Sequence, residues 1–172
     1  MEGRVSSCMI RVAGPDDVEA VYNLYFHPDL NKFVLEEDEG LEKFREMYAE
    51  FLKSYTFFLY EEGEKVLGLL GYRNFWGKMK HVSRIGPILV YPEYSGKGIG
   101  SRLMERAFEE AEKDRATRVE LWVEVENQRA LKLYKKFGFR EEGINRNRIR
   151  VGDRYLDSRV MAVIKDGNTE KD

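Results

Sequence analysis

Cysteine and histidine are almost absent from this chain of 172 residues. The single cysteine, Cys8, excludes an internal disulfide and a cysteine-based metal cluster. The two histidines, His27 and His81, are too few and too far apart in the chain to suggest a zinc site. We therefore expect a fold that needs no disulfide and a chemistry that needs no metal.

Long apolar runs and an excess of one charge are also missing. No apolar run approaches the roughly 20 residues of a membrane-spanning helix, and the first residues do not follow a signal-peptide pattern. The 29 basic and 31 acidic residues nearly cancel, which gives no general reason to bind nucleic acid. We expect a cytoplasmic protein with neither a membrane nor a nucleic-acid partner. Glutamine is scarce too, since Gln128 is the only one, and this bias favours a heat-adapted source.

The length and the 42% hydrophobic content fit one domain with its own core. We expect this domain at residues 9–164, between an N-terminal extension (1–8) and a C-terminal tail (165–172). Apolar periodicity and turn residues predict helices and strands within it. The expected helices are 14–26, 40–52, 99–113 and 128–137, and the expected strands are 9–13, 55–60, 65–72, 82–90, 119–125, 140–150 and 155–164. This order predicts an α/β fold, a mixed sheet with helices on both faces.

A glycine-dense loop follows the apolar strand end Ile88-Leu89-Val90 and precedes a helix. Its glycines at 96, 98 and 100 leave backbone N–H groups uncovered at the positive end of the helix dipole, which predicts binding of a phosphate or pyrophosphate. The glycine spacing fits neither a Walker loop nor a dinucleotide-binding fingerprint. From the loop alone, a tight strand-to-helix connection is an equally good interpretation.

A second motif spans residues 117–139 and combines a β-branched strand with an amphipathic helix. Asn127 is a good N-cap for this helix, and Gly138 suits the position just after its end. One helical face is expected to contain Ala130, Leu133, Tyr134 and Phe137.

Together, the two motifs resemble the GCN5-related N-acetyltransferase (GNAT) superfamily. Its pyrophosphate loop, Gln/Arg-x-x-Gly-x-Gly/Ala, matches residues 95–100, except that Ser95 replaces the usual Arg or Gln. Its later region, Leu-x-Val-x-x-x-Asn-x-x-Ala-x-x-Leu-Tyr-x-Lys-x-Gly-Phe, is matched at Leu121, Val123, Asn127, Ala130, Leu133, Tyr134, Lys136, Gly138 and Phe139. The resemblance covers about residues 9–164, and residues 142–161 look like the branch that acylates small molecules and amino acids. It implies a mostly antiparallel central sheet of six to seven strands with splayed central strands.

The resemblance also implies acetyl-CoA as co-substrate. The pantetheine arm is expected to pair with the backbone of Ile88, Leu89 and Val90, and an N–H near Leu89 to polarise the thioester carbonyl. The expected cofactor-binding residues are Ile88, Leu89, Val90, Ser95, Gly96, Lys97, Gly98, Ile99, Gly100, Ser101, Asn127, Ala130 and Tyr134. Ser95 lacks the guanidinium that would hold a phosphate with two hydrogen bonds. Lys97 fits a phosphate contact and a solvated loop lysine equally well.

Direct transfer poses two proton problems, because a free primary amine titrates at about 10 and the leaving thiolate needs a proton. Tyr134 matches the family's general acid, whereas from the helical pattern alone it reads as a core aromatic. The base is open. Glu124, which shares a strand face with Trp122, and His81 are candidates, and a water chain is a third. A surface carboxylate and an exposed loop histidine are the competing interpretations.

The acceptor is expected to meet the first two helices. The acidic run 36–39 and the later acids Glu42, Glu46 and Glu50 fit either attraction of a cationic acceptor or a solvated helix face. The aromatics Tyr22, Tyr25, Phe26, Phe33, Phe75 and Trp76 fit either an acceptor pocket or the core.

These features predict an N-acetyltransferase that acts on a primary amine of a small molecule, such as an amino acid or a polyamine. A protein N-terminal or lysine acetyltransferase is the alternative within the class. A non-catalytic acyl-CoA-binding regulatory module is the alternative of another class. Exposed strand edges near the C-terminus could pair between two chains, so a homodimer is compatible with the sequence.

Overall fold

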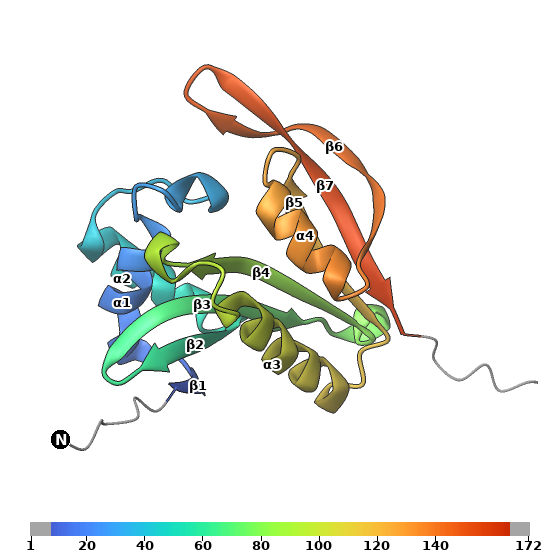
Figure 1. Cartoon of the computed structure of the whole chain (residues 1–172), viewed down its shortest axis with the longest axis horizontal. Helices are drawn as coiled ribbons and strands as arrows, with labels where there is room; N and C mark the ends of the chain where they lie inside the picture. The colour runs from blue at the N-terminus through green and yellow to red at the C-terminus, as the bar shows by residue number, and fades with distance from the viewer. Residues whose placement is uncertain (1–7, 166–172) are drawn as a thin grey trace, which may run out of the picture. The chain divides into compact units, whose positions relative to one another are not determined.

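A computed structural model describes residues 8–165, with elements in the order that Figure 1 shows. The expected extension and tail lie outside the described residues, apart from Cys8 and Lys165. The strands are β1 (Cys8–Val12), β2 (Thr56–Glu62), β3 (Lys65–Asn74), β4 (Val82–Val90), β5 (Arg118–Glu124), β6 (Arg140–Val151) and β7 (Arg154–Ile164). The α-helices are α1 (Val18–Tyr25), α2 (Leu41–Phe51), α3 (Ile99–Lys113) and α4 (Gln128–Lys136), and the short 3-10 turns are η1 (Pro15–Asp17), η2 (Asn31–Phe33), η3 (Gly77–Met79) and η4 (Pro92–Tyr94). No helix in this part of the chain is long and apolar enough to cross a membrane.

The seven strands form one sheet in the order β1-β2-β3-β4-β5-β7-β6. The β1–β2, β5–β7 and β6–β7 pairs are antiparallel, and β4 pairs with β5 in parallel. The expected mixed, mostly antiparallel sheet is therefore confirmed. The β4–β5 register covers three residue pairs, from Val82–Arg118 to Arg84–Glu120. Beyond it, Gly86 has φ +135° and Pro87 has no N–H, so both interrupt a regular strand ladder.

The described residues divide into two compact units, 8–71 with 87–107 and 72–86 with 108–165. We refer to them as the first unit and the second unit. Their segments interleave along the chain, because β3, β4 and α3 each continue from one unit into the other. The expectation of a single domain at residues 9–164 stays a prediction.

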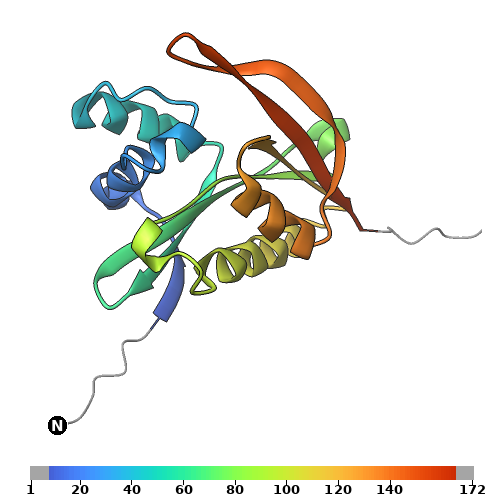
Figure 2. The same cartoon turned by 45° about the horizontal axis from the view of Figure 1, so that its top comes forward.

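Buried aromatic rings form the core of the first unit. Helices α1 and α2 lie side by side in Figures 1 and 2, and they join β2 in this core. The Phe44 ring lies 5.4 Å from the Tyr25 ring and 6.0 Å from the Tyr48 ring, centroid to centroid. Tyr22, Phe26 and Phe33 pack against the same cluster. Core packing therefore accounts for the aromatic residues of α1 and η2 that the sequence also offered as pocket lining.

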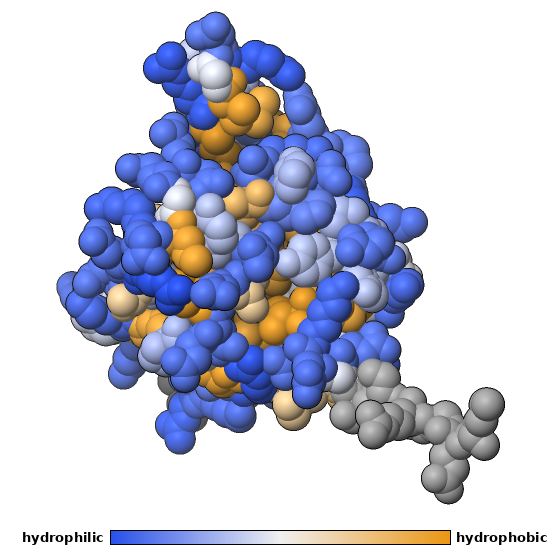
Figure 3. All heavy atoms as spheres, turned by 90° about the vertical axis from the view of Figure 1, so that its left-hand side faces the viewer, coloured by the Kyte–Doolittle hydropathy of each residue, from blue (hydrophilic) through white to orange (hydrophobic). Residues whose placement is uncertain are grey.

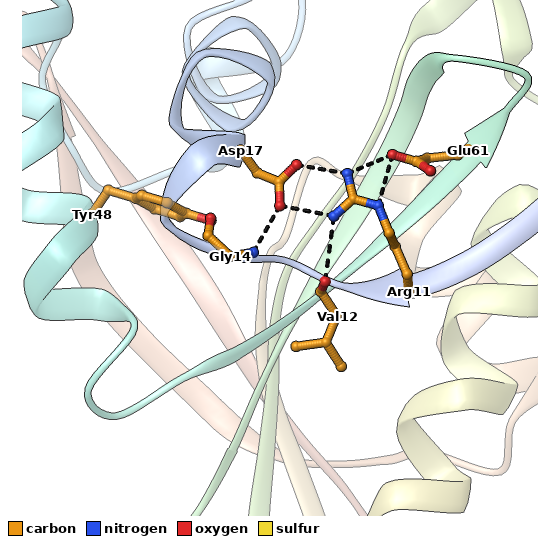
Figure 4. Close-up of polar contacts among 6 residues, drawn as sticks. All are labelled: Arg11, Val12, Gly14, Asp17, Tyr48 and Glu61. Atoms are coloured by element: carbon orange, nitrogen blue, oxygen red, sulfur yellow. Dashed lines mark hydrogen bonds and ion pairs between the residues drawn. The ribbon is translucent and has the colours of Figure 1, made fainter.

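A polar network connects β1, β2 and the start of α1 within the first unit (Figure 4). The Arg11 guanidinium donates to Asp17 at 2.6 and 2.8 Å and to Glu61 at 2.5 and 2.9 Å. Asp17 also accepts the Gly14 N–H at 2.7 Å, and the Tyr48 hydroxyl donates to the Gly14 carbonyl at 3.0 Å. These bonds lower the pKa of Asp17, with the hydrogen bond from Arg11 as the main cause.

The second unit buries one face of β5 and leaves polar residues on the other. Val119, Leu121 and Val123 are buried, whereas the alternate residues Trp122 and Glu124 are only half-buried, as the strand period predicts. Helix α4 buries Leu131 and Tyr134. The predicted helical face included Tyr134, which is buried, but did not include the buried Leu131. Its other members, Ala130, Leu133 and Phe137, are only half-buried.

Exposed apolar atoms occur in separate groups on the face drawn in Figure 3, where most of the surface is hydrophilic. The charges of α2 are largely paired along the helix, because Lys43, Arg45 and Lys53 contact Glu46, Glu42 and Glu50. This pairing favours the solvated helix face over a patch that attracts a cationic acceptor.

Candidate functional site

The glycine loop has the conformation that anion binding requires. Gly96 and Gly98 have φ of +79° and +83°, in the left-handed region that favours glycine. The N–H groups of Gly96, Lys97 and Gly98 donate to no acceptor in the described part of the chain. Helix α3 begins at Ile99, so these donors lie at its positive end. Gly100 and Ser101 belong to the first turn of the same helix, at its positive end.

Cations and an unpartnered hydroxyl surround this loop. The Lys65 Nζ donates to the Tyr94 hydroxyl at 3.1 Å, and the Lys97 Nζ lies 4.8 Å from the centre of the same ring. The Ser95 Oγ is buried and has no hydrogen-bond partner among the described residues. Because nearly all buried polar groups in proteins have a partner, this hydroxyl fits a loop that is completed by a ligand oxygen.

The strand end beside the loop depends on a glycine that the sequence analysis did not single out. Leu89 is buried, and Ile88 and Val90 are half-buried at the end of β4. A Cβ on Gly68 of β3 would lie 2.9 Å from the Leu89 carbonyl oxygen and 3.3 Å from Ile99 Cγ2. Gly68 therefore allows β3 to approach both the strand end and the start of α3. A glycine inside a strand is the available sequence signal for such an approach.

Asn127 caps α4 as expected. Its side-chain oxygen accepts the Ala130 N–H at 3.1 Å, and it immediately precedes the helix. Ile99 is buried, so only its backbone is available to a ligand. The structure thus gives local structural roles to Asn127 and Ile99, and their expected contact with a cofactor stays a prediction.

Tyr134 is 5% exposed, and its ring lies 5.9 Å from the Phe139 ring. Its hydroxyl makes no hydrogen bond in the described part of the chain. Burial raises the pKa of Tyr134, and the negative charge of Glu124 raises it further. The phenol is therefore protonated near neutral pH, which is the state that a general acid needs.

The two candidate bases differ in their surroundings. Glu124 is half-buried at the end of β5, where burial raises its pKa and the positive charge of Arg148 opposes that effect. His81 is exposed, and its backbone carbonyl accepts the N–H groups of Thr117 and Arg118. The side chain of His81 is thus exposed on a loop, as the interpretation without a catalytic role expected. Of the two, Glu124 interacts electrostatically with Tyr134.

A family model described as "Acetyltransferase (GNAT) family" matches residues 18–139. The chain belongs to this family. The match includes the glycine loop and the whole of α4, the two regions on which the resemblance was based.

Relatives and solved structures agree with this membership. An uncharacterised N-acetyltransferase of Methanocaldococcus jannaschii is 30% identical over 86% of this chain and 67% of its own length. The L-amino acid N-acetyltransferase AaaT of Escherichia coli is 35% identical over 51% of this chain and 54% of its own length. The E. coli [ribosomal protein bS18]-alanine N-acetyltransferase is 36% identical over 44% of this chain and 51% of its own length. The chain thus spans about half the length of the last two.

Two solved structures share the fold. An N-acetyltransferase from Staphylococcus aureus aligns with a TM-score of 0.81 and 24% identity, over 92% of this chain and 99% of its own. The yncA protein from Salmonella typhimurium, solved with its cofactor acetyl-CoA, aligns with a TM-score of 0.80 and 22% identity, over 97% and 99% of the two chains. At these identities the likeness concerns the fold.

Proposed function

We propose that this protein transfers an acetyl group from acetyl-CoA directly to a primary amine of a small molecule. The observation that carries the proposal is the glycine loop at the start of α3, where three backbone N–H groups have no acceptor within residues 8–165. Membership of the acetyltransferase family and the acetyl-CoA in the yncA structure support it.

The backbone N–H groups from Gly96 to Ser101 would hold the pyrophosphate, with the Lys97 side chain close by. The buried Ser95 hydroxyl and the N–H groups of Gly96, Lys97 and Gly98 have no partner among the described residues, and they fit such an anion. The backbone of Ile88, Leu89 and Val90 would hold the pantetheine arm. Acetyl-CoA supplies the activated acyl group, so the protein needs no covalent acyl-enzyme and contributes mainly by positioning the two substrates.

The ammonium first loses one proton to water. The neutral amine nitrogen then forms a bond to the thioester carbon, the carbon–sulfur bond breaks, and the second amine proton passes to Glu124. Tyr134 donates a proton to the departing sulfur. Burial raises the pKa of both groups, which favours a Glu124 that can accept a proton and keeps Tyr134 protonated.

The test is thiol release from acetyl-CoA with a panel of amino acids, polyamines and peptides. Tyr134→Phe is expected to lower kcat about 100-fold, the size typical of general acid catalysis. Tyr155→Phe is the matched control, because Tyr155 is 57% exposed in the same unit, and it should retain full activity. Tight binding of acetyl-CoA without thiol release for any amine would instead favour the non-catalytic binding module.

Acetylation of a protein N-terminus is the second candidate. The E. coli [ribosomal protein bS18]-alanine N-acetyltransferase, which matches residues of this chain at 36% identity, favours it. A peptide with an N-terminal alanine, compared with free alanine and spermidine, separates the two candidates. Higher kcat/KM for the peptide would favour the protein acceptor.

A further inference from the structure

Two buried polar atoms that have no partner in the described part of the chain share one sheet face in the second unit. On β5 this face contains Trp122 and Glu124, and Ser158 of β7 lies directly opposite Glu124 in the antiparallel register. Ser158 is completely buried, yet its Oγ has no hydrogen-bond partner among the described residues. The buried Nε1 of Trp122 also lacks a partner there. Two such atoms so close in the sheet indicate that an acceptor group completes this face.

Two arginines lie against the Trp122 ring. The Arg84 guanidinium carbon is 3.9 Å from the ring centre and the Arg148 carbon is 5.2 Å from it. Arg84 also donates to Glu120 at 2.9 Å. Arg148 is exposed and has no carboxylate within hydrogen-bonding distance in the part of the chain that the structure describes. Partial loss of water lowers the pKa of Arg148, the negative charge of Glu124 raises it, and the positive charge of Arg84 lowers it. Arg148 thus feels the charge of Glu124 but forms no ion pair among the described residues.

An irregularity in β6 sets the position of Arg148. The β6–β7 register shifts between Asn145 and Ile149, and Asn147 within this bulge has φ +52°. The Asn147 N–H donates to an Asp157 carboxylate oxygen at 2.8 Å. The Asp157 carbonyl in turn accepts the Val125 N–H at 3.0 Å, next to Glu124. Bulges commonly redirect a side chain beside an active site, and this one is fixed to the end of β5.

The charges at this face match the two ends of an amino acid. Glu124 is negative, and the positive charge of Arg148 acts on it, but the two side chains form no ion pair among the described contacts. An ammonium group beside Glu124 and a carboxylate beside Arg148 would satisfy both. A polyamine has no anion to offer, and two arginines on one indole would repel it.

We propose that Arg148, stacked with Arg84 on Trp122, binds the carboxylate of the acceptor, so that the substrate is a free α-amino acid or a close analogue. The proposal rests on the acetyl transfer proposed above. It assigns specificity to the face formed by β5, β6 and β7. It also excludes a protein N-terminus as the best acceptor, because a peptide carries an amide where the carboxylate is needed.

The first test compares free L-amino acids with their amides in the thiol-release assay. For the best amino acid, kcat/KM should exceed that of its amide at least tenfold, because the charge-assisted bond to Arg148 is lost in the amide. Arg148→Gln should remove this preference and leave the KM of acetyl-CoA unchanged. Arg146→Gln is the matched control, since Arg146 is exposed on the same strand, and it should keep the preference. Equal use of acid and amide by the unaltered protein, or a preference retained in Arg148→Gln, overturns the proposal.

The second test measures binding without turnover. In a Trp76→Phe background, Trp122 is the only tryptophan of the chain, so its fluorescence reports on this face. The acetylated form of the best amino acid, added with CoA, should change this fluorescence in a saturable way, whereas the acetylated amide should require at least tenfold more ligand. If the acetylated acid binds saturably and more tightly than the amide, but no assay shows thiol release, the proposed acetyl transfer is wrong and the proposed anion site is supported. Identical titrations with acid and amide would refute the site, whatever the activity.

Discussion

Aromatic rings have different neighbours in the α1–α2 core of the first unit and on the Trp122 face of the second unit. In the core, rings contact other rings, as Phe44 contacts Tyr22, Tyr25, Phe26 and Tyr48. In the second unit, the rings of β5 and of the segment after β3 contact guanidinium groups. Arg84 lies over both Phe75 and Trp122, at 4.9 and 3.9 Å from the ring centres. The first arrangement excludes water, and the second retains charge at a partly exposed face.

This difference separates two tasks. The proposed phosphate loop works through its backbone, so it benefits from a rigid apolar support that fixes the chain without contributing side-chain chemistry. The proposed acceptor face works through side chains, which must stay reachable. We expect substitutions in the first unit to change stability and cofactor affinity, and substitutions in the second to change acceptor selectivity.

The largest effect is expected for Phe44→Ala. Phe44 is 2% exposed, so its truncation should lower the free energy of unfolding by about 3–5 kcal/mol. Phe75→Ala, at a half-buried ring of the second unit, should cost only about 1 kcal/mol. Urea unfolding followed by circular dichroism measures both values. Similar losses for the two variants would contradict the contrast between the units.

The next effect concerns the support of the loop. Gly68→Ala places a methyl group 2.9 Å from the Leu89 carbonyl and should destabilise the protein by about 1–3 kcal/mol. It should also weaken CoA binding, measured by calorimetry. Gly143→Ala is the control, because a Cβ there meets nothing within 4 Å. Unchanged CoA affinity in Gly68→Ala would show that the loop does not depend on this close packing.

An effect of similar size at neutral pH, which becomes smaller in acid, is expected at the Arg11 network. Arg11→Met should lower the free energy of unfolding at neutral pH by about 1–3 kcal/mol, because it removes the charge-assisted hydrogen bonds that Arg11 donates to Asp17 and Glu61. The folded pKa of Asp17 is depressed, so its stabilisation is present above the unfolded pKa and is lost as the pH falls through the folded one. The difference between wild type and variant should therefore shrink in acid. A difference that stays constant in urea titrations down to pH 2 would argue against this linkage.

The smallest effect is a shift in the pH profile of Arg148→Gln. The positive charge of Arg148 lowers the pKa of Glu124, so its removal should move the acidic limb of kcat/KM to higher pH. Ser158 and Tyr134 also face or interact with Glu124, and neither carries a charge near neutral pH. Arg146→Gln should leave the limb in place. If the acidic limb of kcat/KM in Arg148→Gln stays in place or moves to lower pH, the result contradicts the assignment of Glu124 as the base.

Local sequence patterns predicted most elements well, because their signals are short-range. The strand 82–90, the end of α3 at Lys113 and the cap at Asn127 all follow from periodicity, caps and glycine positions. The glycine loop was recognised for the same reason. The Gly86-Pro87 interruption of β4 has a visible signal that was not used.

The acceptor face was harder to predict because it depends on register between distant strands. Trp122 and Glu124 were placed on one strand face by alternation alone, and the structure agrees. Arg148 had no comparable signal. Its position depends on the bulge at Asn147 and on Asp157, ten residues further along the chain. A one-residue change of register would send Arg148 to the opposite face, and no local pattern specifies that register.

Asp157 contacts β6 through its carboxylate and the residue after β5 through its carbonyl. We therefore expect a displacement of the bulge to shift the chain beside Glu124. An acceptor whose carboxylate fits badly against Arg148 would then misalign Glu124, the group that accepts the amine proton. Discrimination among acceptors would consequently appear in kcat as well as in KM, so poor substrates would be slow even at saturating concentration.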